Sequence, residues 1–249
     1  ITRLNDTPTN ADSVRFLVIF SRTVTGVDKN DFSLSTKDLE GASISSLAGS
    51  GANYTVTVNT GNGTGSLRLD VIDDDSIIDT EGNPLGTTGI GNGDFRSGET
   101  YTIDKLPPSV QSITRLDPNP TNAETVDFLV TFSEPVSGVD INQFDLTVQG
   151  LTGSEIENIE GSVETYALTV STGSGSGSLR LDLIDVDAIL DEADNPLGGV
   201  GASNGDFREG ETYTIDKIPP YVLSITRLDR NPTSAETVDF LVTFSEPVS

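Results

Sequence analysis

The chain repeats its own sequence with a period of about 112 residues and without any insertion. The tetrapeptide Ile1–Leu4 recurs at 113–116 and again at 225–228, and the two full copies agree at roughly 65 positions. The third copy runs for only about 25 residues, which is too few to bury a core of its own. We therefore expect the chain to be part of a longer tandem array. Such arrays more often provide length and spacing than catalysis. The expected units are repeat 1 (residues 1–106), repeat 2 (residues 107–218) and the first strands of a truncated repeat 3 (residues 219–249).

The composition restricts the chemistry that is available. The chain contains no Cys, His, Met or Trp. This excludes thiol nucleophiles, imidazole bases, disulfides and the usual zinc and copper sites, and it rules out a Ser-His-Asp triad. We therefore expect a protein that is not an enzyme. Carboxylate oxygen is the remaining strong ligand, and calcium is the cofactor that it favours.

The net charge of −25 also restricts the partners. Nucleic acid and anionic lipid are disfavoured because both require a positively charged surface. No apolar run is long enough to span a membrane, so we expect no direct membrane insertion.

Alternating apolar and polar residues predict an all-β protein. Val126, Phe128, Val130 and Phe132 alternate with Asp127, Leu129 and Thr131, and both other copies carry the same pattern. For repeat 2 the pattern predicts seven strands, at about 109–116, 125–133, 143–149, 154–159, 164–171, 177–184 and 211–216. Seven short antiparallel strands in a unit of about 110 residues are typical of an Ig-like β-sandwich. We therefore expect tandem Ig-like β-sandwiches in an end-to-end array.

Gly and Pro mark the connections. The run Gly173–Gly177 predicts a hairpin connection, and Pro135 is expected to end its strand because proline cannot donate to a ladder. Double prolines follow Asp104-Lys105 and Asp216-Lys217 at the repeat boundaries. Such segments favour extended, semi-rigid geometry, so we expect the sandwiches to form a stiff rod.

Short motifs in repeat 2 carry a family resemblance. They are Thr131–Val136, Asn142–Thr147, Ile189–Asp191, Asn195–Leu197 and Tyr213–Lys217. Together they resemble the tandem bacterial Ig-like domains of large surface proteins, adhesins and S-layer-associated proteins. The resemblance implies an exported stalk or filament that is often stiffened by calcium at its domain junctions. Repeat 1 departs from the pattern at Arg22-Thr23, where the other copies have Glu-Pro, so it lacks a ligand if Glu134 and Glu246 bind a cation.

Repeated aspartates are the candidate calcium ligands. At the end of one strand, three of them recur at matching positions, and one more lies in each linker: Asp73, Asp75, Asp79, Asp104, Asp185, Asp187, Asp191 and Asp216. Carboxylates that alternate along a strand can converge on a hard cation. Alternatively, they are solvated or accept hydrogen bonds from nearby backbone amides, as aspartates in turns do. The linker acids could also gather with Asp28 or Asp140 and with Asp94 or Asp206 to form a junctional site.

The sequence leaves two classes of function open. The first is a non-catalytic stalk, adhesin spacer or filament subunit on the bacterial surface or outside the cell. Its partners would be neighbouring repeats of the same or another chain, with strand exchange if the chain ends at Ser249. The second is a module that binds a surface glycan or protein through the Gly-rich loops near 86–98 and 198–210. We expect Phe95 and Phe207 to pin these loops to the sandwich. Because the loops repeat along with everything else, the spacer is favoured.

Overall fold

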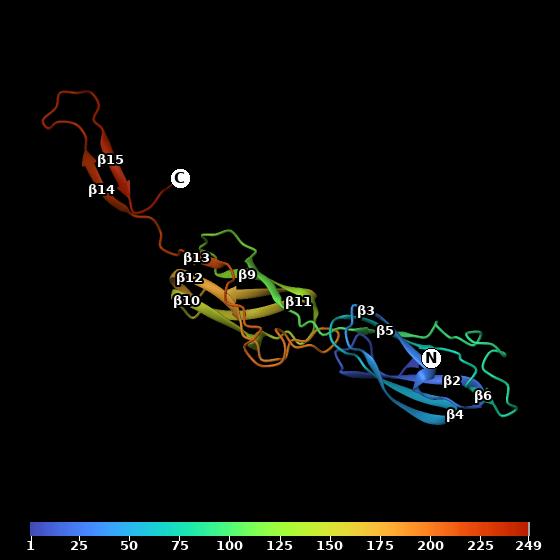
Figure 1. Cartoon of the computed structure of the whole chain (residues 1–249). Helices are drawn as coiled ribbons and strands as arrows, with labels where there is room; N and C mark the ends of the chain where they lie inside the picture. Colours follow the sequence, from blue (N-terminus) through green and yellow to red (C-terminus); the bar gives the residue numbers. More distant parts are fainter. Residues whose placement is uncertain (249) are drawn as a thin grey trace.

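The computed structural model describes residues 1–248 and consists almost entirely of antiparallel strands (Figure 1). Within this range there is no α-helix, and hence no helix that could cross a membrane. The strands of repeat 1 are β1 (Thr2–Arg3), β2 (Ser13–Thr25), β3 (Phe32–Lys37), β4 (Ser43–Asn59), β5 (Gly65–Val71), β6 (Ile78–Asp79) and β7 (Thr100–Ile103). Those of repeat 2 are β8 (Val110–Arg115), β9 (Thr125–Val136), β10 (Phe144–Thr152), β11 (Glu155–Ser171), β12 (Ser174–Leu183) and β13 (Thr212–Ile215). Two short 3-10 turns, η1 (Lys29–Asp31) and η2 (Ile141–Gln143), and the hairpin β14 (Val222–Arg227) with β15 (Phe240–Phe244) complete the described part.

Both full repeats are two-layer sandwiches with the same topology. In repeat 1, one sheet has the order β1-β2-β4, with β6 also pairing with β2, and the facing sheet has the order β3-β5-β7. In repeat 2, the corresponding sheets are β8-β9-β11 and β10-β12-β13. The all-β, Ig-like fold predicted from the alternating pattern is therefore confirmed.

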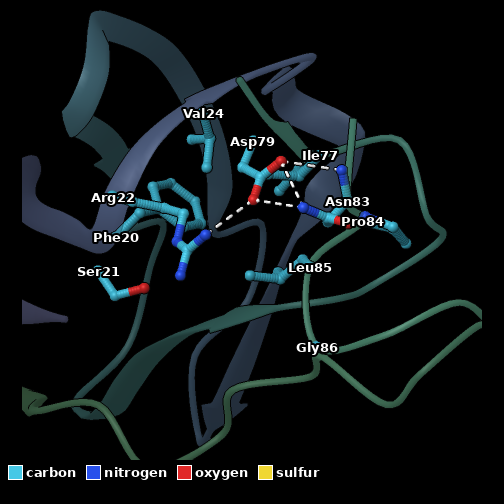
Figure 2. Close-up of a pocket in the computed structure, with 10 residues that line it drawn as sticks. All are labelled: Phe20, Ser21, Arg22, Val24, Ile77, Asp79, Asn83, Pro84, Leu85 and Gly86. Carbon is cyan, nitrogen blue, oxygen red and sulfur yellow. Dashed lines mark hydrogen bonds and ion pairs between the residues drawn. The ribbon is translucent and has the colours of Figure 1, made fainter. Parts of the chain in front are cut away.

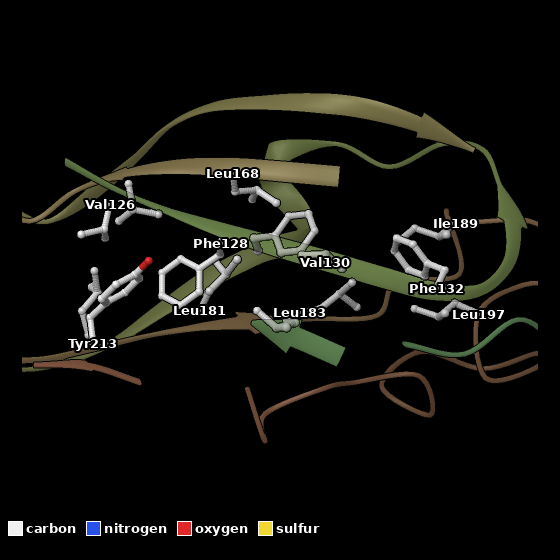
Figure 3. Packing of buried hydrophobic residues seen from close by; sticks show 14 of the residues in the cluster. Val126, Phe128, Val130, Phe132, Leu168, Leu181, Leu183, Ile189, Leu197 and Tyr213 are labelled. Atoms are coloured by element: carbon white, nitrogen blue, oxygen red, sulfur yellow. The ribbon is translucent and has the colours of Figure 1, made fainter. Parts of the chain in front are cut away.

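The apolar residues of the alternating pattern fill the space between the sheets. In repeat 2, Phe128 and Val130 of β9 are fully buried against Leu181 and Leu183 of β12 (Figure 3). Phe128 and Tyr213 meet edge to face, with ring centroids 5.0 Å apart, in the arrangement that aromatic pairs prefer. The corresponding rings of Phe16 and Tyr101 in repeat 1 are also 5.0 Å apart. Each repeat thus has its own buried cluster of apolar side chains.

Several strand boundaries differ from the prediction, and two of the differences have identifiable reasons. Strand β9 continues to Val136 instead of ending before Pro135. Its pairing with β11 shifts from Thr131 directly to Val136, so Pro135 has no ladder bond to donate. Strand β12 begins at Ser174 rather than near residue 177. Its glycines allow this, because a Cβ on Gly177 would overlap the carbonyl oxygen of Gln149 on β10.

The long span of β11 contains a sharp reversal. In a straight strand, residues 161 and 165 would lie about 13 Å apart, at about 3.3 Å per residue. Instead, a Cβ on Gly161 would overlap the carbonyl oxygen of Thr165, and both Gly161 and Val163 have positive φ. The two predicted strands at 154–159 and 164–171 are therefore the two arms of β11.

The repeats follow one another along an extended molecule (Figure 1). The segment 104–110 runs from β7 of repeat 1 directly into β8 of repeat 2. Beyond repeat 2, β14 and β15 form a two-stranded hairpin with exposed apolar side chains, including Ile225 and Phe240. Ser249, the last residue of the predicted third unit, lies outside the described residues. The junction between repeats 1 and 2 is thus the place where one complete sandwich meets another.

Candidate functional site

The first half of the linker is fixed to repeat 1. The backbone amide of Lys105 donates to Thr64 Oγ1 at 3.0 Å, and its side-chain ammonium donates to the carbonyl of Gly61 at 3.0 Å and to Asp12 at 3.0 Å. Asp104 accepts from Thr64 Oγ1 at 3.1 Å and from the amide of Leu106 at 3.0 Å. Asp104 and Lys105 therefore continue the structure of repeat 1.

The second half of the linker is fixed to repeat 2. The amide of Ser109 donates to Ser133 Oγ at 2.9 Å, and the amide of Ser133 donates back to the carbonyl of Ser109 at 2.8 Å. The amide of Gly198 donates to the carbonyl of Pro108 at 2.9 Å. Because both prolines lack an N–H, their carbonyls are the groups that this stretch has available for bonding.

Asn195 joins the two halves. Its side-chain amide donates to the carbonyl of Asp104 at 3.1 Å and to Asp191 Oδ2 at 2.8 Å, and its Oδ1 accepts from Asn10 of repeat 1 at 3.2 Å. Asn195 is only 7% exposed. A buried amide with all these partners fixes the position of the linker relative to repeat 2.

Three carboxylates from different segments meet beside Asn195. Asp104 from the linker, Glu134 from β9 and Asp191 each place a carboxylate oxygen within 4.8 Å of the other two. Within residues 1–248 this is the one group of three or more acidic side chains that come so close together. Its donor set is entirely oxygen, which suits calcium or another hard cation rather than zinc.

The cluster carries unbalanced negative charge. The pKa of Glu134 is raised above its usual value by burial first, and then by the negative charges of Asp191 and Asp104. Lys105, the nearest cation along the chain, turns away to Asp12 and Gly61. A bound divalent cation would relieve this repulsion, with Asp104, Glu134 and Asp191 as its ligands.

Repeat 1 holds a fixed positive charge at the matching position. Arg22 stands where repeat 2 has Glu134, and its Nη1 lies 3.0 Å from Oδ2 of Asp79, the counterpart of Asp191 (Figure 2). Asp79 also accepts two hydrogen bonds from the Asn83 side chain. These bonds, together with the Asn83 and Glu81 amides and Arg22, lower the pKa of Asp79 to about 2, the Asn83 side chain having the largest effect. The guanidinium thus supplies at this end of repeat 1 the charge that the acidic cluster of repeat 2 lacks.

The aspartates at the strand ends are engaged by backbone amides. Asp73 accepts from the amides of Asp75 and Gly93, and Asp75 accepts from Gly89. Repeat 2 repeats this scheme, with Asp185 bound to Asp187 and Gly205, and Asp187 bound to Gly201. These four carboxylates hold the Gly-rich loops, and the structure does not bring them together with Asp79 or Asp191.

The remaining predicted ligands lie at turns and at the second junction. Asp191 accepts from the amides of Ala193 and Asn195, at 2.8 and 2.9 Å, as expected for an aspartate that closes an Asn-Pro turn. Asp216 accepts from the amide of Ile218 at 3.1 Å and lines a cavity together with Glu246. The bond to Ile218 matches the bond from the Leu106 amide to Asp104.

The other acids proposed for a junctional site have local partners. Asp28 and Asp140 cap the two 3-10 turns. Asp94 and Asp206 accept from the amides of Asp73 and Asp185 and pair with Arg96 and Arg208. The acid that joins Asp104 and Asp191 is instead Glu134, and its signal in the sequence is the Glu-Pro pair that replaces Arg-Thr.

Both Gly-rich loops are held to the sandwich at their phenylalanines, by backbone in repeat 1, where the Phe95 side chain is exposed, and by backbone and side chain in repeat 2. Phe95 forms an antiparallel bridge with Val71, and Phe207 forms the same bridge with Leu183. Phe207 also packs against the core of repeat 2. In repeat 2 the loop contacts the linker, with Gly198 bonded to Pro108 and Gly199 beside Pro107. This loop is therefore part of the junction.

Comparison with known proteins gives structural likenesses only. No family model matches the chain, and no curated protein matches it. Among solved structures, the chain is similar to the Escherichia coli adhesin FdeC, with 15% identity and a TM-score of 0.43 over 98% of this chain and 71% of that one. It is also similar to invasin, described as a bacterial integrin-binding protein, with 10% identity and a TM-score of 0.40 over 98% of this chain. The chain spans 46% of the length of that invasin structure.

Proposed function

We propose that this chain is a non-catalytic structural segment of a large extracellular or bacterial cell-surface protein, in which it acts as a stiff stalk or adhesin spacer. The observation that carries this proposal is the linker, whose backbone and side chains are bonded to the sandwich on each side. A tether bonded in this way transmits orientation from one repeat to the next, whereas a free tether does not. The resemblance of the short sequence motifs to those of tandem surface domains supports the same role.

We further propose that calcium stiffens the junction by binding Asp104, Glu134 and Asp191. The cation would bridge the linker and two segments of repeat 2, and would remove the repulsion among three carboxylates. Because only the assembled junction offers all three ligands, binding would stabilise the docked arrangement over an undocked one. At a calcium concentration one hundred times the dissociation constant, this stabilisation amounts to about 2.7 kcal/mol.

A calcium titration of the full chain tests this role. We expect the melting temperature to rise with calcium and to fall back with EDTA, and X-ray scattering to show an extended particle whose dimensions vary less when calcium is present. Glu134→Gln should remove most of the calcium effect, whereas Glu164→Gln, at an exposed acid outside the cluster, should preserve it. If neither melting nor scattering responds to millimolar calcium or to EDTA, the metal proposal is wrong. A bent and mobile pair of domains in every condition would contradict the spacer itself.

A further inference from the structure

The end of repeat 1 that is remote from the linker carries an open groove. One part of it is a cavity of about 340 Å³ bordered by Ile1, Phe20, Leu85 and Phe95. A neighbouring cavity of about 310 Å³ shares Phe20 and Leu85 and extends to Arg22. Figure 2 shows Leu85 pointing into the space between the strand at Phe20 and the loop at Gly86. Apolar side chains therefore face solvent along a continuous track.

The same track in repeat 2 is filled by the linker. The residues that match Ile1, Phe20 and Leu85 are Ile113, Phe132 and Leu197, and all three are at most 2% exposed. The two serines that match Ser21 are bonded in the same way at both junctions. Ser133 exchanges two hydrogen bonds with Ser109, and Ser245 exchanges two with Tyr221.

Repeat 1 retains the groups that hold the linker elsewhere. Ser21 matches Ser133, and Gly86 matches Gly198, whose amide donates to the carbonyl of Pro108. Among the described residues, neither the Ser21 hydroxyl nor the Gly86 amide has a hydrogen-bond partner within the protein. A donor, an acceptor and an apolar floor thus lie in the arrangement that binds an extended Pro-Pro segment in repeat 2.

We propose that this groove of repeat 1 binds, without a metal ion, an extended segment with the sequence of the linker at residues 104–110, Asp-Lys-Leu-Pro-Pro-Ser-Val. The prolines cover Leu85, a proline carbonyl accepts from Gly86, and the serine exchanges hydrogen bonds with Ser21. The aspartate of the segment then lies beside Arg22, where repeat 2 places Asp104 beside Glu134. The guanidinium pairs with that aspartate and with Asp79, so the charges balance without calcium.

A peptide that copies residues 104–111 tests this inference on the full chain in EDTA. We expect saturable NMR shifts at Ser21, Gly86 and Phe95, and at least tenfold weaker binding when both prolines of the peptide are replaced by glycine. An unrelated proline-rich peptide that lacks the Ser-Val end should not bind with comparable affinity. If it does, the groove is only a generic apolar surface and the inference is wrong.

Charge reversal tests the proposed orientation. Wild-type protein should bind the Asp peptide about three- to tenfold more tightly than the same peptide with Asn in that place. Arg22→Glu should reverse this preference in EDTA, and calcium should restore binding of the Asp peptide to the variant. Since the Arg22 side chain is largely exposed and repeat 2 has Glu134 at the matching position, the fold should tolerate the change. An unchanged preference in the variant would overturn the proposed docking.

A linked version avoids the weak affinity expected of a short free peptide. The segment 104–112 is placed directly before Ile1, which preserves the spacing found ahead of Ile113. We expect hydrogen exchange at the Gly86 amide to slow towards the rate of the Gly198 amide in the same molecule, and a Gly-Gly version of the segment to give no slowing. If neither the peptide nor the linked segment affects the groove, the inference fails. The calcium proposal would still stand, because it concerns a different junction.

Discussion

The side-chain amide of Asn195 donates a hydrogen bond of 3.1 Å to the carbonyl of Asp104, joining repeat 2 to the linker that leaves repeat 1. Its counterpart in repeat 1, Asn83, donates to the carboxylate of Asp79, as Asn195 donates to that of Asp191. Asn195 and Asn83 thus share the bond to an aspartate of their own repeat, and the bond from Asn195 to Asp104 is the contact that acts at the junction.

Asn195→Ala should loosen the junction. It leaves the Asp104 carbonyl and the Asn10 side chain without their partner, at a cost of about 1–3 kcal/mol for a buried polar group. Because the chain has no cysteine, one engineered cysteine in each repeat allows clean spin labelling. We expect a wider distance distribution in Asn195→Ala and an unchanged one in Asn83→Ala. Equal broadening in both variants would contradict a junctional role.

Glu134 should make the junction sensitive to pH. Its pKa lies above the ordinary 4.5, so the folded state binds its proton more tightly than the unfolded state does. The resulting stabilisation is complete below the ordinary value and is lost as the pH rises through the raised pKa. In EDTA we therefore expect the free energy of unfolding, measured with denaturant, to decline over this window.

The variant Glu134→Gln should lack this decline, whereas Glu164→Gln should retain it. Calcium should also suppress it, because a cation competes with the proton for the carboxylate. If the pH profiles of Glu134→Gln and wild type coincide, the cluster does not govern the response.

The strands could be predicted from sequence because the core imposes them. Val126, Phe128 and Val130 alternate with period two, and one face of each strand must be buried between the sheets. The early start of β12 could not be predicted. In the sequence, Gly177 indicates a turn, whereas in the structure it lies within a strand and allows β10 to approach closely. The same residue type serves both purposes, and the choice between them depends on a neighbouring strand.

The candidate site was predictable only in part. Asp104 and Asp191 recur at fixed spacing, but so do Asp73, Asp75, Asp185 and Asp187, which bind loop amides and lie outside the cluster. Glu134 joins Asp104 only because the linker docks on β9, an arrangement that depends on how two folded units meet. The one indication in the sequence was that Glu134 of repeat 2 is replaced by Arg22 in repeat 1. The structure explains this difference, because Arg22 forms an ion pair with Asp79 at the position of the acidic cluster.

Asn83 should control the acidity of Asp79. The pKa of this carboxyl is lowered from 3.8 to about 2, with the Asn83 side chain as the largest cause and the Arg22 contact as a smaller one. A lowered pKa means that the contribution to stability is present above 3.8 and is lost as the pH falls through about 2. Carboxyl NMR titration should show a clear upward shift in Asn83→Ala and a smaller one in Arg22→Ala. A larger shift in Arg22→Ala would show that the ion pair dominates instead.

Tyr213 should stabilise repeat 2 through its hydroxyl group. The hydroxyl donates to the carbonyl of Asp127 at 2.7 Å and accepts from the amides of Leu116 and Asp117, at 3.1 and 2.8 Å. Tyr213→Phe keeps the ring in the core but removes all three bonds and leaves the Asp117 amide without a partner, whereas the Leu116 amide still donates to the Asp127 carbonyl at 3.0 Å. We therefore expect a loss of about 1–3 kcal/mol in urea unfolding.

Tyr101→Phe should have a similar effect on repeat 1, because its hydroxyl bonds Arg15, Leu4 and Asn5 in the same way. Tyr166→Phe is the matched control, since that hydroxyl makes a single bond of 3.3 Å to Val136. Its loss should therefore be clearly smaller. Equal losses for Tyr213 and Tyr166 would mean that ring packing, rather than the bonded hydroxyl, determines the effect. In that case, the hydroxyl bonds that join β13 to β9 and to the segment after β8 contribute little to the stability of the sandwich.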